Sequence, residues 1–213
     1  MKYELIIFDW DGTVVNSIQQ IVQCIHAAGE QVGLPQLTDL EAQSIIGLGI
    51  HESILTLHPQ ATETQIHGMI DAYKSAWLSA FANDIQFYPT VESTLRELSS
   101  QHKLAVATGK SRAGLDRHFS LSSISEVFHT SRCADETTSK PDPHMLHEIL
   151  DELDIPAHKA LMVGDTTYDL EMAQRAGMDS IGMSYGAHSI EALEACDPKT
   201  ILHTMSDIHH WLK

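Results

Sequence analysis

The sequence predicts an α/β protein with a mostly parallel sheet, similar in layout to a Rossmann fold, and a block of helices inserted after the first strand. Short apolar runs rich in β-forming residues end abruptly in small and polar residues. Helical patterns separate these runs, an alternation typical of βαβ units. One long stretch, from about residue 17 to 83, keeps a helical period throughout. The total of 213 residues suits one domain with such an insertion.

Four apolar runs are predicted to be strands of the sheet: Leu5–Phe8, Leu104–Ala107, Leu161–Val163 and Ser180–Met183. Weaker strand candidates lie at Val127–Phe128 and Ile201–Leu202. The first three runs break into polar or small residues at Asp9, Thr108 and Gly164. Because ligands of parallel sheets gather at the carboxyl ends of the strands, we expect these three ends to open on one cleft.

The helical block begins with Ile18, Ile21, Val22 and Ile25, which follow an i, i+3, i+4, i+7 spacing. Thr38 and Thr62 each start a capping-box pattern at the beginning of a later helix. A parallel sheet rarely needs several consecutive helices in one crossover. We therefore expect a helical cap domain at residues 16–87 and a core domain at 1–15 and 88–213. The alternative is that these helices simply cover the sheet.

The composition excludes several classes of protein. With 43% hydrophobic and 20% charged residues, the chain is expected to be globular rather than disordered. Its net charge of −16 disfavours nucleic acid and anionic membrane surfaces as partners, although it permits a small anionic substrate in a local cleft. Three widely spaced cysteines, and a first apolar run that Asp9 cuts short, favour a reduced, cytoplasmic protein. No stretch approaches the roughly 18 apolar residues of a membrane span.

Asp9 and Asp11 lie two residues apart at the end of the first predicted strand, and Gly12 permits a sharp turn there. Two carboxylates next to a buried strand have three explanations. They could bind a divalent cation, share a proton, or cap a following helix. The pair alone does not choose among these, since the pattern is short and common.

Three further signals follow the other strands. Asp165 and Asp169 are four residues apart, so they would share a face at a helix start, where simple capping is the alternative. Thr108 and Gly109 offer a hydroxyl and a backbone N–H to an anion. Lys140 adds a cation, although a single lysine is more often a solvated surface residue.

In chain order these signals are an acid pair, a hydroxyl, a lysine and a second acid pair. In that order, and over nearly the whole chain, the sequence resembles the haloacid dehalogenase superfamily. The position of the helical block is similar to that of the subclass with a helical cap after the first motif, and among these to phosphoglycolate phosphatase-like proteins. The segments that carry the resemblance are Phe8–Ser17 for the first motif, Thr108 for the second, Lys140 for the third, and Gly164-Asp165 with Asp169 for the fourth.

The resemblance implies a phosphoric monoester hydrolase that works through an aspartyl-phosphate. Asp9 would be the nucleophile, and Asp11 would protonate the leaving oxygen and later deprotonate the attacking water. Thr108 and the Gly109 N–H would bind a phosphoryl oxygen. Lys140 would offset charge and orient Asp9.

The resemblance also implies a Mg²⁺ cofactor and a small phosphate ester as substrate. Asp9, the main-chain carbonyl of Asp11 and Asp165 would bind the ion, with Asp169 in support. Phosphoglycolate, a sugar phosphate, a nucleotide and pyrophosphate are all open as that ester, and we expect a monomer or a homodimer.

Two other functions are open on the same residues. A phosphomutase would pass the phosphoryl group to a sugar hydroxyl before water arrives. A non-enzymatic phosphoacceptor signalling domain also combines acids, Thr and Lys at strand ends. The large cap disfavours the latter because a receiver needs an exposed switching face. Displacement of halide is disfavoured because it does not need the acid at Asp11.

Three features outside the motifs carry smaller expectations. Trp10, between the two acids, is expected to pack in the core. The run Gly47–Gly49 forms either a loop that reaches the site or a plain helix–helix turn. His144 and His147 are expected at the surface rather than in a metal site.

Overall fold

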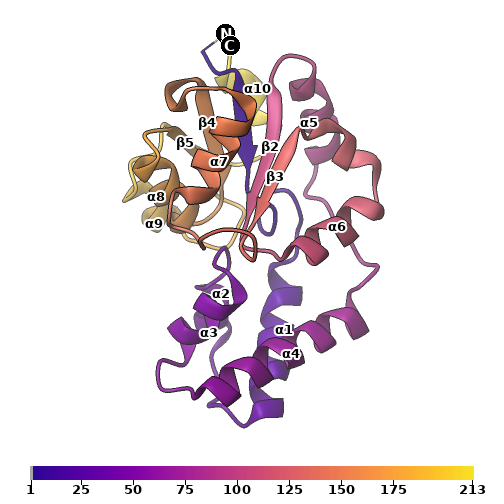
Figure 1. The fold of residues 1–213 in the computed structure, drawn as a ribbon. Coiled ribbons are helices and arrows are strands. Elements are labelled where there is room, and N and C mark those ends of the chain that lie inside the picture. The colour runs from indigo at the N-terminus through magenta and orange to yellow at the C-terminus, as the bar shows by residue number, and fades with distance from the viewer. Residues whose placement is uncertain (1) are drawn as a thin grey trace.

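The computed structural model describes residues 2–213 and confirms the parallel α/β sheet (Figure 1). Over these residues the sheet has six strands in the order β3-β2-β1-β4-β5-β6, and every neighbouring pair is parallel. The strands are β1 (Leu5–Phe8), β2 (Lys103–Thr108), β3 (Thr130–Cys133), β4 (Ala160–Gly164), β5 (Asp179–Met183) and β6 (Thr200–Leu202). Strands β2 and β3 lie on one side of β1, and β4, β5 and β6 lie on the other. The strand order therefore reverses between β1 and β4, and ligands of open parallel sheets bind at such a point.

One strand prediction is wrong. Val127 ends a 3-10 helix, η1 (Ser123–Val127), and Phe128 follows it, so this apolar pair lies before the edge strand β3 rather than in it. Val127 is buried in the core, which explains its apolar character. In β3 only Cys133 is buried, so this edge strand lacks the continuous apolar run that marks a central parallel strand.

Helices cover both faces of the sheet, which is why the central strands are apolar on both sides. Ile6 and Phe8 of β1 share one apolar cluster with Leu95 of α5. Leu5 and Ile7 point to the other face and share a cluster with α7 and α8. The helices around the sheet are α5 (Val91–Ser99), α6 (Arg112–Ser120), α7 (His144–Leu153), α8 (Thr167–Arg175), α9 (Ile190–Glu194) and α10 (Asp207–Trp211), with the short η2 (Ala157–Lys159).

The inserted block, which we call the helical segment, contains α1 (Ile18–Val32), α2 (Asp39–Gln43), α3 (Ile50–Leu57) and α4 (Glu63–Ala80). Capping boxes at Thr38 and Thr62 begin α2 and α4, as predicted. The four helices enclose an apolar cluster that Ala187, from the loop after β5, also joins, and Ile25, Ile54 and Met69 are almost fully buried in it. In Figure 1 the segment lies beyond one end of the sheet instead of on its faces. None of the helices described over residues 2–213 is long and apolar enough to cross a membrane.

Candidate active site

The loop after β1 brings the first acid to the centre of the sheet edge. The Asp9 N–H donates to the Val163 carbonyl of β4 over 2.9 Å, so Asp9 continues the strand pairing. Gly12 then turns the chain with a φ of 91°, a conformation that favours glycine. The Gly12 Cα faces the carboxylate of Asp165, leaving no room there for a side chain. The β1 loop and the β4 end are therefore in direct contact.

Three buried carboxylates and one ammonium group meet at this point. Carboxylate oxygens of Asp9, Asp165 and Asp169 all lie within 4.8 Å of one another. Lys140 Nζ donates to Asp9 Oδ1 and to Asp169 Oδ1, each over 2.6 Å. The four side chains are at most 1% exposed. One positive charge faces three acids, so the cluster needs further positive charge or protons to be stable.

The same imbalance shifts the pKa values of these groups. Burial raises the pKa of Asp9 well above its ordinary value, Lys140 opposes the shift, and the charges of Asp169 and Asp165 add to it. Burial and then the charge of Asp169 raise the pKa of Asp165 to about 7. Burial acts to lower the pKa of Lys140, but the charges of Asp169 and Asp9 outweigh it, so the net shift is upward and Lys140 stays protonated.

The cluster has the donor atoms that a small divalent cation requires. Asp9 Oδ2 is buried and has no hydrogen-bond partner among residues 2–213. Asp165 Oδ1 accepts from Thr13 Oγ1 over 2.6 Å, and Asp165 Oδ2 accepts from the Ala187 N–H over 2.7 Å. Each carboxylate oxygen keeps a further lone pair. A set of hard anionic oxygens with one unpartnered member fits Mg²⁺.

Asp11 lies outside this carboxylate cluster through its side chain. Both of its oxygens accept from Lys110 Nζ, over 3.0 and 2.9 Å, and Oδ1 also accepts from Ser17 Oγ over 2.7 Å. Burial acts to raise the pKa of Asp11, but the charge of Lys110 and the hydrogen bond from Ser17 outweigh burial, so the net shift is downward. The two acids of the β1 loop therefore have opposite electrostatic environments.

The end of β2 supplies the hydroxyl and the glycine. Thr108 is buried, and its Oγ1 accepts from the Lys110 N–H over 3.1 Å. Gly109 faces the helical segment so closely that an added Cβ would lie 2.5 Å from the carbonyl oxygens of both Gly47 and Leu48. Glycine at position 109 therefore permits the close approach of these two parts of the chain.

The run Gly47–Gly49 reaches the site, which decides between the two alternatives for it. The Gly49 N–H donates to Ser139 Oγ over 2.8 Å, next to Lys140 in the chain. A second contact lies nearby, where Tyr168 Oη donates to the Ser44 carbonyl over 3.0 Å. The loop thus lies against three of the predicted motifs, and it is more than a turn between helices.

The comparisons with known proteins identify the family. A family model described as "Haloacid dehalogenase-like hydrolase" matches residues 6–183, which is most of the chain. The chain belongs to this family. This hydrolase is 28% identical over 210 residues to the pyrophosphatase PpaX of Bacillus cereus strain B4264, covering 98% of this chain and 95% of that one.

Solved structures resemble this hydrolase over its whole length. A predicted phosphoglycolate phosphatase from Haemophilus somnus 129PT has a TM-score of 0.87 and 25% identity, covering 100% of this chain and 99% of that one. A putative haloacid dehalogenase-like hydrolase from Bacteroides fragilis has a TM-score of 0.90 and 24% identity, with coverages of 97% and 100%; it supports the fold. The predicted family, the fold and the assignment as a hydrolytic enzyme are confirmed, and these relatives are named as phosphatases or hydrolases.

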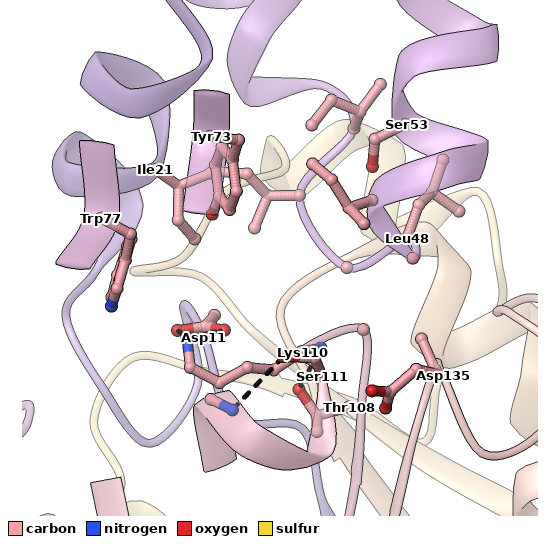
Figure 2. A pocket seen from close by; sticks show the side chains of 18 of the residues that line it. Asp11, Ile21, Leu48, Ser53, Tyr73, Trp77, Thr108, Lys110, Ser111 and Asp135 are labelled. Atoms are coloured by element: carbon pink, nitrogen blue, oxygen red, sulfur yellow. Dashed lines mark hydrogen bonds and ion pairs between the residues drawn. The ribbon is translucent and has the colours of Figure 1, made fainter. Parts of the chain in front are cut away.

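A cavity of about 520 Å³ separates the core of this hydrolase from the helical segment, and Asp9, Asp11, Thr108 and Lys110 line its core side (Figure 2). The structure thus brings all the predicted site residues to one end of the sheet. Lys140, Asp165 and Asp169 lie behind Asp9, and they do not line the cavity themselves.

Sequence reasoning missed several residues that hold the site together. Lys110 and Ser17 bind the Asp11 carboxylate, and Thr13 binds Asp165. Lys110 follows Thr108 by two residues, so its place beside the predicted anion site was the available signal. No sequence signal marked Ser139 as the partner of the loop at Gly49.

The remaining expectations for single residues are confirmed. Trp10 is fully buried, packs edge-on against Phe119 and Phe128, and donates from Nε1 to His118 Nδ1 over 2.9 Å. Burial lowers the pKa of His118 to about 4, which keeps this ring neutral and able to accept. His144 and His147 are exposed on α7.

Proposed function

We propose that this hydrolase is a Mg²⁺-dependent phosphatase that acts on a small phosphorylated metabolite through an aspartyl-phosphate on Asp9. One observation carries the proposal. The buried Asp9 carboxylate is fixed through Oδ1 by Lys140, while its Oδ2 has no partner within the described chain. Asp9 also lines the cavity, so the carboxylate that Lys140 fixes is positioned there for attack on phosphorus, while the unpartnered Oδ2 is left for a cation.

The chain's own residues account for the steps. The Asp9 carboxylate attacks phosphorus in line while the bond from phosphorus to the leaving oxygen breaks. Asp11 protonates that oxygen and later takes a proton from the water that attacks the aspartyl-phosphate, which releases phosphate and restores Asp9. The Thr108 hydroxyl and the Gly109 N–H bind phosphoryl oxygens. Because the ion pair with Lys110 opposes protonation of Asp11, we expect Lys110 to shift toward the phosphoryl group when substrate binds.

We further propose that Asp9, Asp165 and the Asp11 carbonyl hold Mg²⁺, with Asp169 in support. When bound, the ion supplies positive charge to the phosphoryl oxygens and to the acid cluster. Lys140 supplies one positive charge to the three carboxylates of that cluster, so negative charge remains for the ion to neutralise.

We propose that residues 16–87 form a cap domain over a core domain of residues 1–15 and 88–213. The separate apolar cluster of the helical segment and its contacts with Gly109 and Ser139 support this division. A cap that closes over the cavity would exclude bulk water from the phosphoryl group. The three cysteines are free, which agrees with the reduced, cytoplasmic location that we propose.

Release of free phosphate tests the function directly. Purified protein is incubated with a panel of phosphorylated metabolites. The panel includes pyrophosphate and phosphoglycolate, because relatives are named after these substrates. We expect phosphate to be released in the presence of Mg²⁺ and not in EDTA. Transfer to a sugar hydroxyl without net release would favour the phosphomutase. A stable phosphoprotein without turnover would favour the signalling domain.

Mg²⁺ should stabilise the protein more at pH 8 than at pH 5. Without metal, the unfolded chain loses the Asp165 proton near its ordinary pKa of 3.8, whereas the folded protein keeps it until about pH 7. Metal-free stability therefore falls as the pH rises through this window, and the penalty persists above it. Because Mg²⁺ offsets that charge, we expect the melting temperature at pH 8 to rise by about 5–10 °C at 100 times the Kd. Thermal unfolding with Mg²⁺ or EDTA measures this, and equal shifts at both pH values would contradict it.

Gly109→Ala should impair catalysis without unfolding the core. The new Cβ would lie 2.5 Å from the Gly47 and Leu48 carbonyl oxygens, so the cap loop must move away from the site. We expect kcat/KM to fall by about 10²-fold, the scale of misplacing a positioning element by about 1 Å. Gly29→Ala, on α1 with nothing within 4 Å of the new Cβ, is the matched control and should retain full activity. Wild-type kcat/KM in Gly109→Ala would show that close cap contact is unnecessary.

A further inference from the structure

The helical segment forms the wall of the cavity opposite Asp9 and Thr108, and this wall would contact the leaving group of the substrate. The cavity of about 520 Å³ falls within the usual range for small-molecule sites. It is far larger than a phosphoryl group needs, so it has room for the rest of the substrate. This inference rests on the proposed function and deepens it by naming a substrate class.

The helical segment gives that wall an apolar and aromatic surface. The rings of Tyr73 and Trp77 on α4 are stacked, with centroids 6.4 Å apart and an interplanar angle of 28°. Figure 2 shows Ile21, Tyr73, Trp77 and Leu48 on the side of the cavity that faces Asp11 and Lys110. Ile25, Ile45 and Ile46 add further apolar side chains to this wall.

The cationic side chains that line the cavity are either paired with a carboxylate or exposed to solvent. Lys110 is the buried cation, and it binds both oxygens of Asp11 while its Nζ lies 4.5 Å from the centre of the Trp77 ring. Lys74 and Arg117 are exposed at the rim, and His51 lies there beside Glu52. Among the described residues that line the cavity, no buried cation is therefore left to bind a second anionic group.

A second anionic group would be costly in this cavity. The leaving group of pyrophosphate is a phosphate, and that of phosphoglycolate carries a carboxylate. Placing either one against isoleucine and tryptophan side chains removes hydration without returning an ion pair. Apart from the exposed His51, Glu52 and Lys74, the polar side chains on the cap wall are Ser53 and Tyr73, which present neutral hydroxyls. These hydroxyls suit neutral hydrogen-bonding groups.

We propose that the substrate is the phosphate monoester of a neutral alcohol with an apolar or aromatic body, which packs against Tyr73 and Trp77. The phosphoryl group faces Asp9, and Lys110 serves that group rather than a second anion. The substrate class therefore differs from pyrophosphate and from phosphoglycolate.

Four small substrates test the proposal by steady-state kinetics with Mg²⁺. Benzyl phosphate has an aromatic neutral body, ethyl phosphate a small neutral one, and phosphoglycolate and pyrophosphate carry a second anion. We expect kcat/KM for benzyl phosphate to exceed that for ethyl phosphate and for phosphoglycolate by about tenfold or more. A kcat/KM for phosphoglycolate or pyrophosphate equal to or above that of benzyl phosphate would overturn the proposal.

Variants of the aromatic wall assign the preference to this site. Trp77→Ala should lower kcat/KM for benzyl phosphate about tenfold and for ethyl phosphate by much less. Trp77→Leu retains apolar volume and so controls for misfolding of the cap. Its kcat/KM for benzyl phosphate should lie between those of the wild type and Trp77→Ala. Leu40→Ala changes an apolar side chain that is 78% exposed on α2 and outside the cavity lining, so it should leave the ratio of the two substrates unchanged. An equal loss for both substrates in both Trp77 variants would contradict the assignment.

Non-hydrolysable analogues separate this inference from the proposed function. Calorimetry should show that benzylphosphonate binds more tightly than phosphonoacetate to the wild type, and that Trp77→Ala removes the difference. This binding result without turnover of any substrate would retain the inference on the pocket and refute the phosphatase. Turnover together with tighter binding of phosphonoacetate would refute the inference alone.

Discussion

Asp9→Asn is expected to abolish phosphate release, with a fall in kcat of about 10⁴-fold or more, as for loss of a catalytic nucleophile. An amide cannot form the aspartyl-phosphate, and no other carboxylate can take its place. Asp11 is bound to Lys110 and Ser17, and Asp165 accepts hydrogen bonds on both oxygens. The measurement is phosphate release from the best substrate of the panel, in the presence of Mg²⁺.

The folded state should tolerate this change. Asp9 is a buried acid whose pKa is raised by burial and by its acidic neighbours, so a neutral amide relieves repulsion in the metal-free protein. We expect the melting temperature of Asp9→Asn in EDTA at pH 8 to equal or exceed that of the wild type.

The control for Asp9→Asn is the same change at Asp154, an exposed residue with a φ of 52° after α7. Asparagine suits that left-handed conformation, and activity there should be unchanged. Deamidation can restore the acid in Asp9→Asn but not in Asp9→Ala. Turnover that is seen in both variants would therefore refute Asp9 as the nucleophile.

The strands that could be predicted are those buried on both faces. β1, β2 and β4 show as continuous apolar runs because helices cover them on both sides. β3 has the sequence TSRC at the sheet edge, so its position depends on pairing with β2, which local composition does not encode. The apolar pair before it belongs to a 3-10 helix whose burial is tertiary.

The site residues also divide into those that the sequence predicts and those that depend on how the chain packs. Asp9, Thr108 and Asp165 could be expected together because each lies at the carboxyl end of a parallel strand, and such strand ends share one edge. Lys140 comes from an irregular loop, so the family resemblance, rather than periodicity, pointed to it. The ion pair of Lys110 with Asp11 joins residues 99 positions apart. Contacts of that kind depend on how the segments pack.

Lys140→Met is expected to cost about 3–5 kcal/mol of unfolding free energy in EDTA at pH 8, the range for breaking a buried ion pair from one side. The Lys140 side chain is fully buried, and its ammonium is bound to both Asp9 and Asp169. Without it, the buried acids lose their counter-ion, so each must remain charged without a partner or take up a proton, and at pH 8 both cost free energy. Urea unfolding followed by circular dichroism measures the loss.

The pH dependence of this loss follows from the acids. Below the raised pKa of Asp9 and the pKa of about 7 of Asp165, these groups carry protons and need no counter-ion. The deficit of Lys140→Met should therefore be smaller at pH 5 than at pH 8, and Mg²⁺ at pH 8 should restore part of it. Lys159→Met is the matched control, because its ion pair with Glu4 lies in solvent and exposed pairs contribute little.

A double variant decides whether the loss arises from the carboxylates or from the volume of the side chain. If unpaired charge is the cause, Asp9→Asn should partly rescue Lys140→Met, so the double variant is more stable than the sum of the single effects. If packing of the lysine stem were the cause, the two changes would add, and the loss would be the same at pH 5 and pH 8. Additive, pH-independent losses would thus show that Lys140 fills space beside Asp9 rather than holding the charge that the proposed chemistry requires.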